Sequence, residues 1–197
     1  MRYARRLPAL LAVAAGLGVV APARATLIVA LDLPAMVERA ERIAVVDVVS
    51  VQAGWNARHD RITTAVQLQV VEAWKGGLQP GTRLTVLQPG GTVGDVTTTV
   101  DGMPRFAPGE RTLVFLHGPP DRATVVGLTQ GKRPLRRDST SGRWMVRGPD
   151  RAGADFIRLP STTQSTMPPA AASTVGDSRE RPLEDLRAQV QALAAAK

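Results

Sequence analysis

Apolar and polar residues alternate along residues 61–74, RITTAVQLQVVEAW. One face of an extended chain over this stretch carries Ile62, Thr64, Val66, Leu68 and Val70. A period of two residues is typical of a β-strand with one solvent-exposed face. Residues 42–55, RIAVVDVVSVQAGW, are apolar on both faces and predict a more central strand, although Asp47 interrupts the run as at a bulge or an edge-facing position. The polar residues 56–60 between the two stretches suit a hairpin connection.

Shorter strand patterns recur along the chain, with glycine- and proline-rich turns between them. They cover residues 82–88, 93–100, 111–117, 123–129 and 143–146. Ahead of all the strands, Asp32 followed by Pro34 is typical of a helix start, and the apolar positions up to Ala40 predict one buried helix face. The pattern predicts a mainly β fold, a small closed antiparallel β-barrel of OB-like type with about five or six strands. An open β-sandwich is the alternative.

The alternation also predicts which side chains fill the core. We expect the barrel interior to contain Ile62, Val66, Leu68, Val70, Leu84, Val86, Leu113 and Phe115. Trp55, Trp74 and Trp144 stand at the ends of predicted strands, where amphipathic rings commonly cap a core.

The first 25 of the 197 residues have the features of a secretory signal peptide. A positively charged start is followed by an apolar run over residues 7–20 and by Ala23-Arg24-Ala25, a small-x-small cleavage site. We expect cleavage after Ala25, a mature chain that begins at Thr26, and a periplasmic or extracellular location. The leader and the composition are typical of an exported bacterial protein.

Cysteine is absent from the chain, which excludes disulfides and lipid anchoring through an N-terminal cysteine. After the first 25 residues there is no apolar segment of the roughly 20 residues needed to span a bilayer. The mature protein is therefore predicted not to be membrane-spanning.

Four regions follow from these patterns. Residues 1–25 form the signal peptide, and residues 26–149 form the β-barrel domain with its preceding short helix. Residues 150–181 are rich in Ser, Thr, Pro and Ala and predict a flexible linker. Residues 182–197 predict a C-terminal helix that docks on the barrel or on a partner. Its apolar face carries Leu183, Leu186, Val190 and Leu193.

Residues with the chemistry for catalysis are scattered. His59 and His117 are the two histidines, and neither stands near a cluster that would supply three or four metal ligands. There is no G-x-S-x-G motif and no pair of carboxylates in a pattern typical of glycosidases. The glycine-rich residues 90–94 lack the lysine of a P-loop and lead into a strand, so they indicate a bend. We therefore predict no catalytic residue, no metal site and no cofactor.

A cluster of basic residues is the most distinctive charge feature. It comprises Lys132, Arg133, Arg136, Arg137, Arg143 and Arg147, with Trp144 among them. Arginine forks suit carboxylates and phosphates, so Lys132, Arg133, Arg136, Arg137, Arg143 and Trp144 form a candidate ligand surface. A solubilising face on an edge hairpin is the alternative interpretation.

The net charge limits the kinds of partner that we expect. The chain has a formal net charge of +8 at pH 7, and loss of a leader with four arginines would leave +4. This modest excess points away from nucleic acid and towards an anionic polysaccharide or an envelope protein.

Several segments resemble a group of small exported bacterial proteins of unassigned activity. They are AERIAVVDVVSV (40–51), VQLQVVEAWKG (66–76), GMPRFAPGERTLVFL (102–116) and VVGLTQGK (125–132). The chain is also distantly similar to the netrin-like module, which includes tissue inhibitors of metalloproteinases. This similarity rests on a short helix followed by AERIAVVDVVSV, a loop and a long strand that ends in WKG. That resemblance implies a five-stranded OB-type barrel. The inhibitory clamp of that family uses an N-terminal cysteine and disulfides, which this chain lacks, so the inhibitory activity is not expected to carry over.

The sequence thus predicts a non-enzymatic binding or interaction module of the bacterial cell envelope, for an anionic polymer or an acidic partner. Two alternatives stay open. One is a protease inhibitor-like protein that acts through an exposed loop such as residues 101–110, and the other is a cryptic hydrolase.

Overall fold

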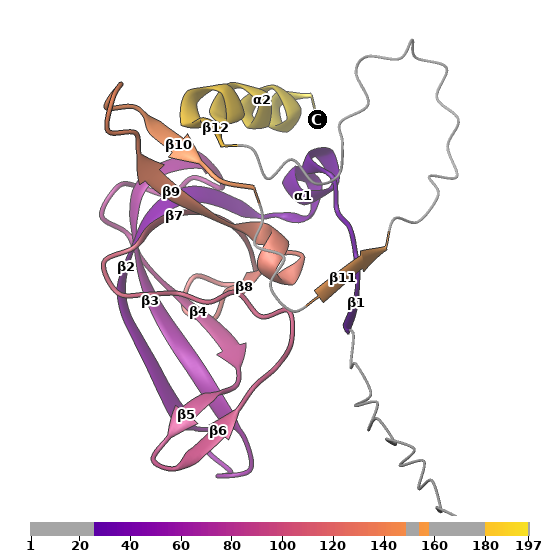
Figure 1. The fold of residues 1–197 in the computed structure, drawn as a ribbon, viewed down its shortest axis with the longest axis vertical. Coiled ribbons are helices and arrows are strands. Elements are labelled where there is room, and N and C mark those ends of the chain that lie inside the picture. The colour runs from indigo at the N-terminus through magenta and orange to yellow at the C-terminus, as the bar shows by residue number, and fades with distance from the viewer. Residues whose placement is uncertain (1–25, 149–153, 158–179, 197) are drawn as a thin grey trace, which may run out of the picture.

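A computed structural model describes residues 26–148, 154–157 and 180–196. The fold is mainly β, with two helices and an eight-stranded antiparallel sheet (Figure 1). The strands of this sheet are β2 (Arg42–Trp55), β3 (Ile62–Lys75), β4 (Arg83–Pro89), β7 (Arg111–His117), β8 (Thr124–Val125), β9 (Lys132–Arg137), β10 (Trp144–Val146) and β12 (Arg181–Pro182). Their order is β12-β10-β9-β7-β2-β3-β4, and β8 pairs with β7. The signal-peptide prediction for residues 1–25 lies outside the described residues.

The long hairpin of β2 and β3 is the centre of the sheet, as the alternation predicts. Asn56 closes its loop, since its side-chain oxygen accepts hydrogen bonds from the backbone N–H groups of Asp60 and Arg61. The predicted inner face of β3 is buried along its whole length. β2 lies between β3 and β7 and packs against a core on each side, which explains why it is apolar on both faces.

Two hydrophobic clusters lie on opposite faces of the sheet. One contains Leu68, Val86 and Val114, together with other side chains on the concave side of β2, β3, β4 and β7. The other contains Leu113 and Phe115 and is covered by the two helices. The eight predicted core residues are all buried. Leu113 and Phe115 nevertheless face the helices, so the eight do not fill a single interior.

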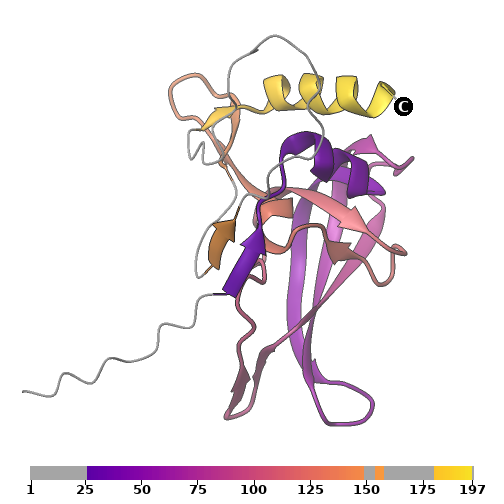
Figure 2. The same ribbon diagram turned by 90° about the vertical axis from the view of Figure 1, so that its right-hand side faces the viewer.

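Both predicted helices are present. In α1 (Leu33–Arg39), the Asp32 carboxylate accepts a hydrogen bond from the Ala35 N–H at 2.9 Å, which confirms the predicted helix start. α2 (Leu183–Ala195) docks in cis, with Leu186 and Val190 fully buried among α1 and the sheet. Figure 2 shows both helices at the same end of the sheet. None of the helices in the described parts of the chain is long and apolar enough to cross a membrane.

Two strand predictions are wrong. Residues 93–100 do not form one strand, because Gly94 and Asp95 make a two-residue turn between β5 (Gly91–Val93) and β6 (Val96–Thr98). Residues 123–129 form only β8 before Gly127, at a φ of 66°, turns the chain into a short 3-10 helix, η1 (Leu128–Gly131). Both turns begin at a glycine that adopts the left-handed conformation.

The segment predicted as a linker contains a strand. β11 (Ala154–Ile157) pairs in parallel with β1 (Thr26–Val29), away from the main sheet. Residues 149–153 and 158–179 lie outside the described parts of the chain.

The strand ladders do not close any of the described sheets into a barrel. The outer edge of β4 is nevertheless not bare. The Thr85 N–H donates to the Pro120 carbonyl at 2.8 Å, the Ala123 N–H donates to the Thr85 carbonyl at 2.9 Å, and the Leu87 N–H donates to the Ala123 carbonyl at 3.0 Å. The segment that pairs with this edge runs directly into β8, which pairs with β7.

Candidate binding surface

The predicted basic cluster folds into the hairpin of β9 and β10, but its members do not share one surface. Successive side chains of a strand point to opposite faces, so neighbours in sequence are separated in space. The structure buries Lys132, turns the guanidinium of Arg133 inward, and pairs Arg136 and Arg143 with acidic groups. Arg137 and Trp144 lie on the side of the sheet that carries Arg111.

Lys132 is buried and has a structural role. Its Nζ lies 2.6 Å from the Glu110 carboxylate, donates to the backbone carbonyl of Arg105, and sits 4.9 Å from the centre of the Phe106 ring. These contacts hold residues 101–110 against the sheet. The prediction that Lys132 belongs to a ligand surface is therefore wrong in this fold.

Arg133 also points inward. Its guanidinium lies 5.8 Å from the centre of the Phe115 ring, and Nη2 donates to the Met36 sulfur at 3.8 Å. Burial, and to a lesser degree the nearby Arg181, lowers the pKa of Arg133 to about 10. A guanidinium packed between apolar groups is held away from a ligand, although the residue as a whole is partly exposed.

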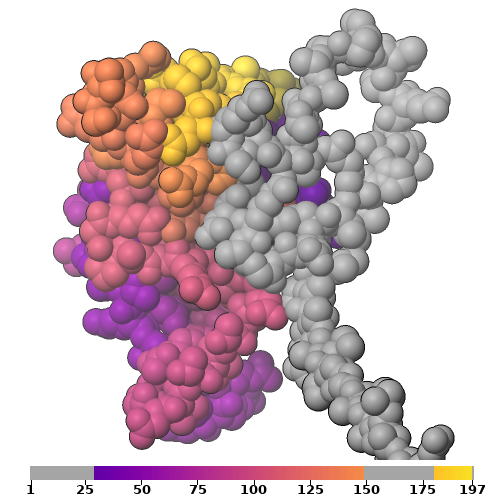
Figure 3. All heavy atoms as spheres, viewed as in Figure 1, coloured from indigo at the N-terminus to yellow at the C-terminus, as the bar shows by residue number. Residues whose placement is uncertain are grey.

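Arg136, Arg143 and Arg147 hold carboxylates from the C-terminal segment. Arg136 Nε donates to Glu180 at 2.6 Å, and Arg147 lies 3.5 Å from the same carboxylate. Arg143 Nε donates to Glu184 at 2.7 Å. The surfaces of the hairpin and of α2 adjoin in Figure 3.

These contacts favour the ionised form of the two acids. The hydrogen bonds from Arg136 and Arg143 lower the pKa values of Glu180 and Glu184 respectively. The hairpin is thus a carboxylate-binding surface within the chain itself.

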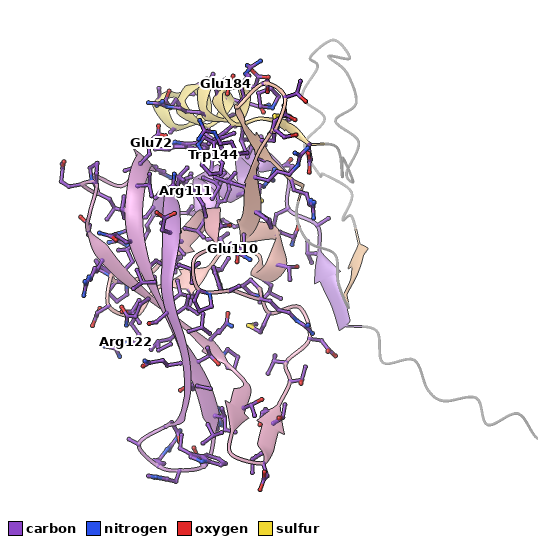
Figure 4. All side chains as sticks on the ribbon, turned by 60° about the vertical axis from the view of Figure 1, so that its left-hand side comes forward. Glu72, Glu110, Arg111, Arg122, Trp144 and Glu184 are labelled. Atoms are coloured by element: carbon purple, nitrogen blue, oxygen red, sulfur yellow. The ribbon has the colours of Figure 1, made fainter. Side chains whose placement is uncertain are left out.

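A second polar group lies beside the hairpin, on the outer face of the sheet near α2 (Figure 4). Arg111 donates from Nε and Nη2 to the two oxygens of Asp47, each at 2.7 Å, and its guanidinium lies 5.1 Å from the centre of the Trp144 ring. The Arg111 hydrogen bond lowers the pKa of Asp47. The sequence marks Asp47 as a break in an apolar run, but it gives no sign that the partner is Arg111.

The three tryptophans differ in their surroundings. Trp74 is buried in the helix-covered cluster, as predicted. Trp144 is half-buried over Arg111, and Trp55 is 41% exposed at the far end of the long hairpin. Trp55 therefore does not cap the core.

The other candidate residues lie apart. His117 Nδ1 is 3.1 Å from a Glu41 oxygen on an exposed surface, and His59 lies in the hairpin loop. Within the described residues, no three His, Cys, Asp or Glu side chains gather as metal ligands would. The loop of residues 101–110 is pinned at both ends, because the Thr129 N–H donates to the Gly102 carbonyl at 3.0 Å and the Gly109 N–H donates to the Val48 carbonyl at 2.8 Å.

In comparisons with known proteins, the chain matches no protein-family model and no curated sequence.

Proposed function

We propose that the protein is an exported, non-enzymatic binding module of the bacterial cell envelope, with an anionic polymer or an acidic partner as its ligand. The observation that supports this proposal is the pairing of Arg136 and Arg143 with carboxylates on an exposed hairpin. Guanidinium groups that bind carboxylates of the chain itself have the geometry to bind carboxylates of a ligand.

Replacing these carboxylates by a ligand should cost little free energy. The side chains of Arg136 and Arg143 are 50% and 54% exposed, and exposed ion pairs contribute little to stability because water and salt screen them. Leu186 and Val190 hold α2 in place. The carboxylates can therefore move aside without the helix leaving the sheet.

Export is the second part of the proposal. Cleavage after Ala25 would start the mature chain at Thr26, the first residue of β1. The chain that follows is firmly held, because Gln130 Oε1 accepts from the Leu31 N–H at 2.7 Å and Gln130 Nε2 donates to the Val29 carbonyl at 3.0 Å. N-terminal sequencing of the exported protein tests this part, and a mature chain that begins at Met1 would contradict it.

For the fold, we propose a nearly closed barrel of OB type. The backbone hydrogen bonds from β4 to residues 120–123, and the pairing of β8 with β7, support a closed circuit of β7, β2, β3, β4 and the β8 segment. Slow hydrogen exchange at the Thr85 and Leu87 amides would fit this closure, whereas exchange at the rate of a free edge would contradict it.

The binding function is tested with the mature chain, immobilised polygalacturonate and neutral dextran. Arg136, Arg137 and Arg143 are changed together to Ser, while Lys132 and Arg133 stay because their charged groups point inward. The variant should lose polygalacturonate binding and keep its melting temperature, and binding by the parent should weaken as salt is added. Equal binding by parent and variant would refute the proposal.

A matched control carries Ser at three exposed arginines outside the hairpin of β9 and β10, Arg58, Arg61 and Arg122. It loses the same three charges and should bind like the parent, which separates a local contact from an effect of net charge.

A further inference from the structure

Four polar side chains stand in register across four neighbouring strands. Arg83 on β4 pairs with Gln69 on β3, Gln69 pairs with Asp47 on β2, and Asp47 pairs with Arg111 on β7. Residues directly opposite each other in a ladder point to the same face, so these four form one row across the sheet.

The row continues into the basic hairpin. Trp144 lies over Arg111, and its own cross-strand neighbour is Arg137 on β9. We name these six residues the transverse row: Arg83, Gln69, Asp47, Arg111, Trp144 and Arg137. Neighbouring strands lie about 4.8 Å apart, so the row from β4 to β9 spans roughly 19 Å.

The transverse row is open to solvent. Arg83, Gln69 and Arg137 are exposed, and the side chains of Asp47 and Arg111 are 39% and 33% exposed. α2 borders the row along one flank, where Arg187 of this helix lies 2.9 Å from Glu72 of β3. Figure 4 shows Arg111 and Trp144 just below this helix.

We propose that an acidic polysaccharide chain lies along the transverse row, at right angles to the strands, and continues onto the basic hairpin. This inference rests on the proposed function and assigns its ligand to polymers of uronic acid type. Arg83 and Arg137 would contact carboxylates at the two ends. Between them, Gln69 and the remaining Nη1 of Arg111 would donate to hydroxyl or carboxylate oxygens.

The charge and shape of the transverse row favour a polymer over a small anion. Three arginines and one aspartate give the row a net positive charge, and the cations are spread along its length. Asp47 and Trp144 fix the Arg111 guanidinium in one orientation, which reduces the entropy lost when a ligand binds. A small anion would reach only one of these cations, whereas an extended chain would reach all of them.

The test is a length series of oligogalacturonates against the mature chain, with Arg83→Gln as the variant. Arg83 lies at the end of the row that is farthest from the hairpin. The variant should therefore lose about two- to fivefold in affinity for oligomers long enough to span the row, and nothing for the dimer. Arg61→Gln makes the same change in net charge off the row and should bind every length as the parent does.

The outcomes separate the two proposals. If Arg83→Gln binds all lengths as the parent does, while the triple Ser variant of the hairpin loses binding, the transverse row is refuted and the hairpin function stands. If the parent binds no oligogalacturonate of any length but binds lipopolysaccharide, the polysaccharide assignment is overturned. If the parent binds neither, the proposed function itself fails.

Discussion

Arg111 and Asp47 face each other directly across the β2–β7 ladder and share two hydrogen bonds of 2.7 Å. The bidentate pair explains why an acidic residue interrupts the apolar run of β2. The pair lies on the same face of the sheet as Leu113 and Phe115. Unlike those two residues it is partly exposed to solvent, so it marks the place where the hydrophobic face ends.

This pair predicts a dependence of stability on pH. The Arg111 hydrogen bond lowers the pKa of Asp47 in the folded protein, so the pair stabilises the fold above the ordinary aspartate pKa of about 3.9. The contribution is lost as the pH falls through the lowered pKa. Asp47→Asn should therefore be less stable than the parent at neutral pH in urea unfolding, and the difference should shrink as the pH falls below the ordinary aspartate pKa.

Arg111→Gln is the partner control for this prediction. It should remove the same pH-dependent difference, and Asp47→Asn should add little to it, because the two side chains form one interaction. A difference between Asp47→Asn and the parent that stays constant from neutral to acid pH would contradict the assignment.

Docking of the C-terminal helix predicts a large effect from one side chain. Leu186 is fully buried among α1, α2 and the sheet, so Leu186→Ala should lower the free energy of unfolding by about 2–5 kcal/mol. Gln191, an exposed residue of the same helix, serves as the control, and its change to Ala should cost less than about 0.5 kcal/mol. Similar denaturation midpoints for the two variants would show that α2 does not stabilise the domain.

The parts of the fold that the sequence predicts well are those with a local signal. Alternation over residues 62–70 identifies β3, and Asp32 with Pro34 identifies the start of α1. The hairpin of β5 and β6 also has a local signal, Gly94-Asp95, which favours a two-residue turn. The alternation of Val96, Thr98 and Val100 instead predicts a single strand, which the turn interrupts.

The candidate site could not be predicted in the same way, because its contacts are distant in the sequence. Arg136 and Arg143 meet acidic residues that follow them by 44 and 41 positions, and Arg111 meets Asp47 over a separation of 64. The basic cluster is dense in sequence, yet the period of a strand places the charged groups of Lys132 and Arg133 on opposite faces of the sheet, in two different environments. Density of charge along a chain therefore does not define a surface.

The Lys132–Glu110 pair predicts the cost of an unpaired buried cation. The Lys132 side chain is 10% exposed, so Glu110→Gln would leave it with the Arg105 carbonyl and the Phe106 ring as its main contacts. The free energy of unfolding should fall by about 1–3 kcal/mol in urea titration. In a Lys132→Met background the same change should cost much less, and an equal cost in both backgrounds would show that the pair is not coupled.

The charge of Arg133 opposes folding, whereas the carbon chain of the same residue supports it. Burial lowers the pKa of Arg133 to about 10, so the folded protein disfavours the charged form. Arg133→Met keeps an unbranched chain against Phe115 and Met36 and should raise the free energy of unfolding by about 1 kcal/mol, whereas Arg133→Ala should lower it by leaving a void. Arg133→Met should also bind polygalacturonate as the parent does, since the side chain points inward. Loss of binding without loss of stability in that variant would return Arg133 to the ligand surface.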